Sequence, residues 1–404
     1  MLQAPIEQMA FWQLAEFAAH HSPFHAKRAW AGRLRAGERP AVDELPLLYK
    51  EDVRDAAAAL VATVRPSGHR TRAVGHTSGS TGSPLEIVKS SRQLDLERAE
   101  NCRLKQSWHR VLPGPHLIVE CATERYPLGS CTQRLDADGT PVTTLYGLEA
   151  GLVADVATRL QIGSIHSWPS VARGLIAVSR ERDGAPLALR AISTRAEVLT
   201  PELRGRLRDE LGCATLDVYG AVETGVLAAE CVDCGLYHTA DRSCLIEVLR
   251  EDGSAAGPGE TGWVVVTPLH SYAMPLLRYV LGDYAVVAEP TRCSEGRLTL
   301  AAILGREKHL FVTPQGRLFV PMIEAKQLCE MPLQQYKLLQ PDFATIEVQY
   351  VAFRGTDVDE RALHAVVCAS LPARFDVRVR QVESIAAAAN GKYFMHERLF
   401  GDSR

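Results

Sequence analysis

The sequence predicts an α/β protein with a large N-terminal domain and a small C-terminal α+β domain. Between residues 71 and 304, short apolar runs such as HLIVE alternate with helical stretches such as PELRGRLRDELG, which is the pattern of an α/β domain. After residue 305, a hairpin, helices and strands are expected in an order that suits a small α+β domain. A chain of 404 residues also exceeds what one hydrophobic core normally serves. We therefore place the domains at 1–304 and 305–404.

The N-terminal 70 residues are predicted to be mostly helical. Apolar residues recur at three- and four-residue spacing in residues 4–21 and 49–64. The first segment lacks a basic region and carries Glu7 and Glu16, which is typical of an amphipathic helix and not of a secretory signal. Ten cysteines without an export signal favour reduced thiols. We expect a cytoplasmic protein.

Composition argues against a polyanionic partner. Lys and Arg number 45 against 48 Asp and Glu, a net charge of −3. Such a balance provides no summed positive field to attract nucleic acid or anionic lipid. The sequence also contains no run of 18 apolar residues that could span a bilayer. We expect neither a nucleic-acid partner nor a membrane partner.

The segment HTSGSTGSP, residues 76–84, lies between two strand-like segments, TRAVG and PLEIVK. Its composition alone also fits a solvated linker, but a loop held between two strands is a tight connection. Gly79 and Gly82 allow positive φ, so that successive backbone N–H groups can surround an anion. Hydroxyl donors are added by Thr77, Ser78, Ser80 and Thr81. The loop therefore predicts a phosphate site.

Five other motifs follow this loop along the chain. They are STRAEVLTPELRGRL at 193–207, TLDVYGAVETG at 215–225, PLLRYVLGDYAVV at 275–287, ILGREKHLF at 303–311 and ANGKYFMHERLF at 389–400. Each alone could be a strand end, a turn or a solvated charge. In this order they resemble the adenylate-forming superfamily of acyl-CoA ligases. HSPFHAKR and LPLLYKEDVRD, with the short length, resemble its phenylacetate-CoA ligase-like branch. The resemblance implies a large multi-sheet α/β domain followed by a small mobile domain.

The resemblance also implies ATP, AMP and Mg²⁺ as bound species, with residues 77–82 on the phosphates. In the family's Y-G-x-x-E motif the aromatic ring stacks on adenine and the glutamate holds Mg²⁺, which implies these roles for Tyr219 and Glu223. Asp217 and Gly220 stand in the same motif and are expected in the nucleotide site.

Further positions complete the implied nucleotide site. Ala196 and Glu197 match a family segment that flanks the adenine. Asp283 matches the aspartate of R-Y-x-x-G-D, whose two oxygens accept hydrogen bonds from both ribose hydroxyls. Arg306 matches the arginine of G-R-x-D-D, which contacts the nucleotide.

Two lysines have implied catalytic roles. Lys308 occupies the hinge position about which the small domain rotates. Lys392 matches the lysine that enters the active site during adenylation and neutralises charge on the carboxylate and the α-phosphate. The alternative for each lysine is a solvated surface charge.

Three departures from the family pattern bear on activity. Arg195 replaces a glycine beside the adenine, Ser83 stands where many relatives have lysine, and Val222 replaces the Thr or Ser before the metal-binding glutamate. The last two departures remove polar groups that would assist phosphate and metal binding.

The residues of the acyl pocket are assigned only from their position in the sequence relative to the family motifs. GSIHSWPSVARG, residues 163–174, matches the place where relatives begin the helix lining the acyl pocket, so His166 and Trp168 are candidate substrate-binding residues. Aromatic walls would suit an aryl or arylacetic acid. Each residue has an equally simple alternative as part of the core.

A cysteine-rich segment predicts a structural zinc site. Cys231, Cys234, His238 and Cys244 lie within fourteen residues. They supply the four soft ligands of a tetrahedral, closed site. Unrelated reduced thiols are the alternative. Phenylacetate-CoA ligase-like proteins include members with zinc near this position.

The resemblance implies an AMP-forming acid–thiol ligase. It would activate a carboxylic acid with ATP and transfer the acyl group to coenzyme A, releasing AMP and pyrophosphate. One alternative keeps adenylation but uses an amine, a carrier-protein thiol or AMP transfer, as in natural-product biosynthesis. Another is a non-catalytic nucleotide-binding relative. The oligomeric state is left open, with a homodimer as one alternative.

Overall fold

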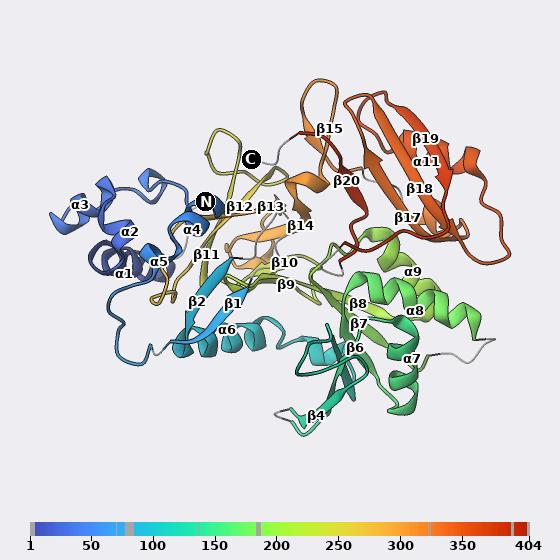
Figure 1. The fold of residues 1–404 in the computed structure, drawn as a ribbon, viewed down its shortest axis with the longest axis horizontal. Helices are drawn as coiled ribbons and strands as arrows, with labels where there is room; N and C mark the ends of the chain where they lie inside the picture. The colour runs from blue at the N-terminus through green and yellow to red at the C-terminus, as the bar shows by residue number, and fades with distance from the viewer. Residues whose placement is uncertain are drawn as a thin grey trace. The chain divides into compact units, whose positions relative to one another are not determined.

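The computed structural model describes residues 5–69, 71–76, 85–136, 138–182, 187–321, 323, 325–388 and 392–401 (Figure 1). The chain forms two compact units: Met1–Ser107 with Val218–Leu304, and Trp108–Asp217 with Gly305–Arg404. Both units combine helices with β-sheet. The predicted α/β class is therefore confirmed.

The first unit begins with the predicted helical segment. Its helices are α1 Pro5–His21, α2 Pro23–Ala26, α3 Ala29–Arg35, α4 Lys50–Asp55 and α5 Ala57–Leu60. Phe11 and Leu14 of α1 pack with Trp30 and Leu34 of α3, and this cluster extends to Leu245 in a strand of the same unit. The helical N-terminus is thus held by apolar burial, the main source of stability for short helices.

Strands form most of the remaining first unit. The strands β1 Thr71–His76 and β2 Glu86–Ser90 pair in antiparallel fashion. The helix α6 Ser91–Leu104 follows at once, with the hydroxyl of Ser90 accepting from the backbone N–H of Gln93 as an N-cap. Further strands lie in the order β11 Cys244–Leu249, β12 Thr261–Pro268, β13 Tyr279–Val287, β14 Thr299–Arg306, β10 Tyr237–Thr239, β9 Gly225–Glu230 and the second half of β8 Ala214–Ala221.

The second unit contains alternating strands and helices. The strands β3 His116–Glu120, β5 Pro141–Tyr146, β6 Ser164–Ser167 and β7 Ala191–Arg195 pair in parallel, and β4 Cys131–Leu135 adds an antiparallel edge. The helices α7 Ala150–Arg159 and α8 Pro169–Glu181 connect β5 to β6 and β6 to β7, and α9 Pro201–Leu211 connects β7 to β8. Helix α9 begins at a Thr200 N-cap and ends at Gly212, which has φ +65°, as helix-end preferences predict.

The C-terminal part of the second unit has its own core. The hairpin of β15 Phe311–Val312 and β16 Leu318–Phe319 confirms the predicted one. The helices α10 Ala325–Cys329 and α11 Glu360–Ala369 accompany a four-stranded sheet. Its order is β19 Asp376–Gln381, β18 Thr345–Ala352, β17 Leu333–Gln340 and β20 His396–Arg398. Because the structure groups this part with Trp108–Asp217 in one unit, the predicted division into 1–304 and 305–404 stays a prediction. The behaviour of this part as a mobile domain also stays a prediction.

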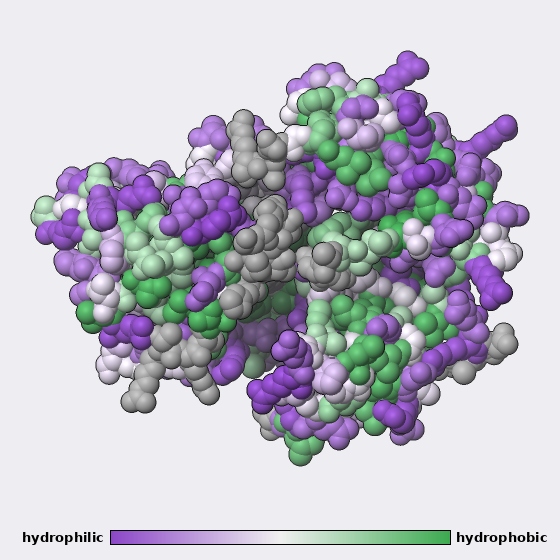
Figure 2. Space-filling view, in the orientation of Figure 1, coloured by the Kyte–Doolittle hydropathy of each residue, from purple (hydrophilic) through white to green (hydrophobic). Residues whose placement is uncertain are grey.

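The surface mixes hydrophilic and hydrophobic areas. On the face drawn in Figure 2, hydrophilic side chains are interspersed with hydrophobic ones. Among the described helices, none combines the length and the apolar character needed to span a lipid bilayer.

Candidate active site

Strands β8 and β13 bring together two of the predicted nucleotide-site residues. Tyr219 in β8 is buried, and its hydroxyl donates to Oδ2 of Asp283 in β13 at 2.9 Å. The two residues are 64 positions apart in the sequence. A phenol ring with a polar tip suits stacking on an aromatic base, and a carboxylate offers further lone pairs to hydroxyl donors.

Glu223 lies in the turn between β8 and β9 and is only 5% exposed. The hydroxyl of Tyr279 is 3.4 Å from its Oε1 atom and donates to it. A carboxylate in a buried turn fits the oxygen ligation that Mg²⁺ requires. The sequence does not identify Tyr279 as a site residue, although the R-Y-x-x-G-D motif contains it.

Gly220 has a packing reason to be glycine. A Cβ atom there would lie 2.6 Å from the carbonyl oxygen of Gly225, across the β8–β9 pair. The strands therefore approach too closely for a side chain at this position. Its expected place in the nucleotide site stays a prediction.

Asp217 belongs to the first half of β8, in the second unit. It is buried and accepts a hydrogen bond from the hydroxyl of Thr194 in β7. This contact satisfies a polar group inside the sheet. A role for Asp217 in nucleotide binding stays a prediction.

Strand β7 ends at Arg195, the arginine that replaces the family's glycine. The Arg195 guanidinium donates to the carbonyl oxygen of Val119 at 3.0 Å and forms an ion pair with Glu120 at 2.7 Å. Its side chain is therefore held at the end of β3. The next residue, Ala196, has a left-handed backbone conformation with φ +71°. A non-glycine residue in this region is uncommon and strained, which is typical of functional loops.

Glu197 is held by two segments of the second unit. Its Oε2 atom accepts from the backbone N–H of Ser170 at 2.8 Å, and its Oε1 atom accepts from the Ser170 hydroxyl at 3.0 Å and the backbone N–H of Tyr393 at 2.6 Å. Burial raises the pKa of the Glu197 carboxyl, and these donors together with the charge of Lys392 offset part of that rise.

Lys392 directly precedes Tyr393 and is half-buried. Its backbone carbonyl accepts from the N–H of Ala388 at 2.8 Å. Its ammonium also acts on the Cys121 thiol, where burial raises the pKa and Lys392 opposes the rise. The structure thus brings Lys392, Glu197 and Cys121 into one region of the second unit.

The predicted hinge residue follows β14. Lys308 lies in a short 3₁₀ turn, and its Nζ atom is 5.4 Å from the centre of the Phe394 ring. Burial lowers the pKa of the Lys308 ammonium. Arg306 is half-buried at the end of β14. The hinge role of Lys308 and the nucleotide contact of Arg306 stay predictions.

The two candidate substrate-binding residues lie in β6 and in the short connection from β6 to α8. His166 in β6 is half-buried, and its Nδ1 atom is 2.7 Å from the hydroxyl of Ser193. Trp168 is 7% exposed and belongs to the apolar cluster of α7, α8 and β7. Trp168 therefore packs as a core residue, the alternative that the sequence left open.

The predicted phosphate loop is located by its neighbours in the chain. Its flanking strands, β1 and β2, confirm that the segment joins two paired strands. The residues Thr77, Ser78, Gly79, Ser80, Thr81 and Gly82, with Ser83, lie outside the described residues.

A cysteine and histidine cluster is assembled in the first unit. The ligand atoms of Cys231, Cys234, His238 and Cys293 all lie within 4.8 Å of one another. The Sγ atoms of Cys231 and Cys293 are 3.5 Å apart, and Cys234 Sγ is 3.4 Å from His238 Nε2. Three thiols and an imidazole are a donor set that suits tetrahedral zinc. Burial and the neighbouring thiols raise the pKa of Cys293 to about 12. A bound cation would stabilise the thiolates and so oppose this rise.

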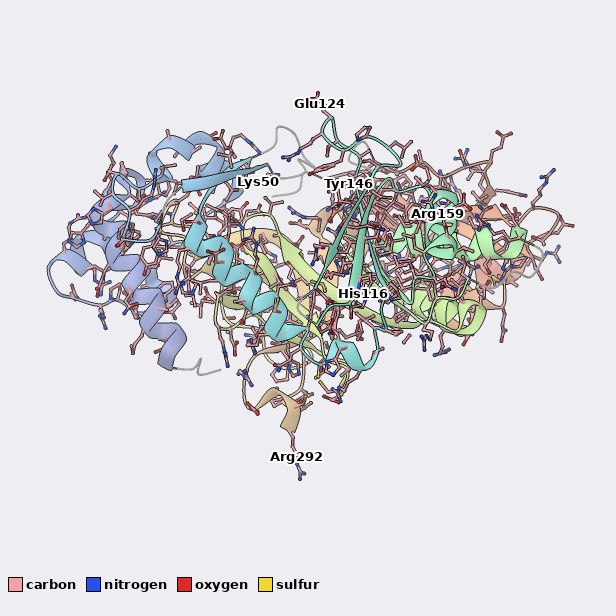
Figure 3. The ribbon with its side chains drawn as sticks, turned by 90° about the horizontal axis from the view of Figure 1, so that it is seen from below. Lys50, His116, Glu124, Tyr146, Arg159 and Arg292 are labelled. Carbon is pink, nitrogen blue, oxygen red and sulfur yellow. The ribbon has the colours of Figure 1, made fainter. Side chains whose placement is uncertain are left out.

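Cys293 corrects the predicted ligand set. Cys244 is not part of the cluster, because it starts β11 and is 1% exposed, with its thiol 3.9 Å from the Ser243 hydroxyl. Cys293 lies in a 3₁₀ turn next to Arg292, whose side chain points outward in Figure 3. Spacing along the chain could not identify Cys293, because it is 62 positions from Cys231. Only its residue type could have pointed to it.

Comparisons with known proteins support one class. No family model matches the chain. It is 31% identical over 298 residues to a phenylacetate-coenzyme A ligase of Thermus thermophilus, a match that covers 70% of this chain and 64% of the relative. The chain thus spans less than two thirds of that relative's length.

Solved structures share the fold. 2-Hydroxyisobutyryl-CoA ligase in the postadenylation state, in complex with R3-HIB-AMP, matches with a TM-score of 0.71 at 18% identity, over 96% of this chain and 88% of that chain. An anthranilate CoA ligase in complex with anthranoyl-AMP matches with a TM-score of 0.59 at 14% identity, over 80% of this chain and 65% of that chain.

The chain has the fold of the adenylate-forming CoA ligases. This confirms the fold that the ordered motifs predict. Over the matched residues, its sequence is similar to that of a phenylacetate-coenzyme A ligase.

Proposed function

We propose that this protein activates a carboxylic acid with MgATP and transfers the acyl group to coenzyme A. The observation that carries the proposal is the arrangement around Lys392. The residue after this lysine is hydrogen-bonded to Glu197, so two motifs 196 positions apart meet in one unit. The names of the similar proteins, which are CoA ligases, support the same reaction.

In the first half-reaction, a substrate carboxylate oxygen attacks the α-phosphorus of ATP. The bond from that phosphorus to the bridging oxygen breaks, and pyrophosphate leaves with its electron pair. The carboxylate and the triphosphate repel each other, so positive groups and N–H dipoles must stabilise the transition state. Lys392 supplies a cation, and residues 77–82 supply N–H groups. Glu223 would hold Mg²⁺, which offsets charge on the triphosphate.

In the second half-reaction, a thiolate attacks the acyl carbon, and AMP leaves. We propose coenzyme A as the acceptor, because an open structure of 2-hydroxyisobutyryl-CoA ligase is in complex with 2-HIB-AMP and CoA. Rotation of residues 305–404 about Lys308 would remove Lys392 and admit the thiol. Acceptors such as an amine or a carrier protein would form product without coenzyme A.

The acid is proposed to be aryl or arylacetic. The names of two similar proteins, a phenylacetate and an anthranilate ligase, support an aromatic acid. His166 is the half-buried candidate for a pocket wall, since Trp168 packs in the core.

A panel of acids with hydroxylamine trapping tests the proposal. The purified protein is incubated with MgATP and each acid, and both hydroxamate and pyrophosphate are measured. An aromatic acid should stimulate both together. Nucleotide binding without acid-stimulated pyrophosphate release by any acid would identify a non-catalytic relative and contradict the proposal.

The cysteine cluster is proposed to hold a structural zinc ion. Four protein ligands would close the coordination sphere, and Cys231 directly follows β9, which begins after the Glu223 turn. The metal would therefore fix the far end of that strand. Elemental analysis of protein purified without chelator should find one zinc per chain. Protein that is folded and active without stoichiometric metal would exclude this role.

A further inference from the structure

Glu197 is a half-buried carboxylate whose partners come from two distant segments. One oxygen, Oε2, accepts from the backbone N–H of Ser170 at 2.8 Å. Ser170 stands in the first turn of α8, directly after Pro169, which has no N–H. The Ser170 amide is therefore the first donor of a 13-residue helix, and its positive end favours a carboxylate there.

The other oxygen joins this helix to the C-terminal segment. Oε1 accepts from the Ser170 hydroxyl at 3.0 Å and from the Tyr393 backbone N–H at 2.6 Å. Two donors satisfy both lone pairs of that oxygen. The Glu197 carboxylate is thus occupied largely by protein groups, which leaves it little capacity to bind the nucleotide.

Tyr393 is fixed from a second side as well. Its hydroxyl donates to the backbone carbonyl of Tyr336 in β17. Its ring is therefore held in the C-terminal sheet, while its backbone is held by Glu197. Both contacts fix Tyr393, and they therefore restrain the backbone of Lys392, the residue directly before it.

We propose that Glu197 is a positioning residue that fixes Lys392 for the first half-reaction by binding the Tyr393 amide. This inference rests on the proposed function, in which Lys392 acts on the carboxylate and the α-phosphate. It differs from the role that the family resemblance implies, in which Glu197 flanks the adenine. When the C-terminal segment leaves for the second half-reaction, the bond from Tyr393 to Glu197 breaks.

The test uses Glu197→Ala and Glu197→Gln in the 404-residue chain. Glu181→Gln, an exposed change at the end of the same helix, is the matched control. Glu197→Ala should lower the kcat of acid-dependent pyrophosphate release by about 10²-fold, as expected from a small misplacement of a catalytic group. Its KM for ATP and its rate of thioester formation from supplied acyl adenylate should stay near those of the wild type.

The isosteric Glu197→Gln variant guards against misfolding. It keeps one acceptor oxygen but turns an NH₂ group toward a donor, so its kcat should lie between those of the wild type and Glu197→Ala. A raised KM for ATP with unchanged kcat would assign Glu197 to the nucleotide and overturn the inference. Equal loss of both half-reactions with a lowered melting temperature would assign it a purely structural role.

Hydrogen exchange provides a readout that does not depend on activity. The Tyr393 amide should exchange about tenfold faster in Glu197→Ala than in Glu181→Gln, because loss of one hydrogen bond changes local opening by about this factor. Unchanged exchange would overturn the inference. If the wild type releases no pyrophosphate but the exchange difference appears, the proposed function fails while the contact stands.

Discussion

Glu202 is buried and Glu197 is half-buried, both in the second unit, but their carboxylates are held by different kinds of partner. Glu202 forms ion pairs with Arg173 at 2.6 Å and with Arg206 at 3.6 Å. Glu197 is held by backbone N–H groups and a hydroxyl. Burial raises the pKa of Glu197, whereas at Glu202 the two arginines outweigh burial and lower the pKa.

The surroundings of Glu202 explain the difference. Arg206 is 1% exposed, and its guanidinium also donates to the carbonyl oxygen of Leu333 at 2.6 Å and lies 5.2 Å from the centre of the Phe353 ring. Helices α8 and α9 are thereby joined to β17 through permanent charges. A carboxylate paired with arginine holds packed elements together, and one held by neutral donors can release a segment at lower cost.

The largest expected effect is on stability. Glu202→Ala should lower the free energy of unfolding by about 3–5 kcal/mol, because it leaves Arg173 buried without its carboxylate and removes one of the two carboxylates paired with Arg206. Urea unfolding measures this loss. Glu197→Ala should cost about 1–3 kcal/mol, because it leaves mainly neutral donors unsatisfied. Equal losses would remove the distinction between the two glutamates.

A second prediction extends the distinction to the cysteines. Cys293→Ser should abolish stoichiometric zinc, since Cys293 is in the cluster, while Cys244→Ser should retain it. Elemental analysis of the two variants decides between the ligand sets. Zinc retained in Cys293→Ser and lost in Cys244→Ser would restore the set that spacing favoured.

A third prediction compares Glu197 with a buried carboxylate of the first unit. Asp283 accepts from the hydroxyl of Tyr219, and its proposed partner is the ribose. Asp283→Asn should raise the KM for ATP by about tenfold or more, since hydrogen bonds to charged groups contribute about 1.5–3 kcal/mol. Steady-state kinetics check this outcome. A lowered kcat with an unchanged KM for ATP would contradict ribose binding by Asp283 and would instead indicate a positioning role like that proposed for Glu197.

The smallest expected effect is on pH dependence. The pKa of Glu202 is lowered on folding, so its stabilisation is present above the ordinary pKa of 4.5 and is lost as pH falls through the folded value. The pKa of Glu197 is raised, so its ionisation costs stability at neutral pH, and this cost disappears on acidification. Melting temperatures should therefore fall more in Glu197→Gln than in the wild type as pH falls from 7 towards 4.5, and fall less in Glu202→Gln than in the wild type as pH falls below 4.5. Identical profiles would argue against opposite shifts.

The sequence predicted what local patterns determine. The strands around residues 76–84, the 311–319 hairpin and helix α9, with threonine at one end and glycine at the other, follow from periodicity and turn chemistry. The ordered motifs also predicted the class. Contacts between segments that are distant in the sequence could not be predicted. Neither Cys293, 62 positions from Cys231, nor the Tyr393 amide on Glu197 has a signature in local spacing.

The most direct test of the account is Lys392→Ala, measured in both half-reactions beside Lys27→Ala, a change at an exposed lysine. Removing the cation should slow acid-dependent pyrophosphate release by about 10²–10³-fold, the usual effect of losing one group that stabilises developing charge. Thioester formation from supplied acyl adenylate should proceed at the rate of the Lys27→Ala control. Equal loss of the two half-reactions, or full adenylation without Lys392, would contradict the account.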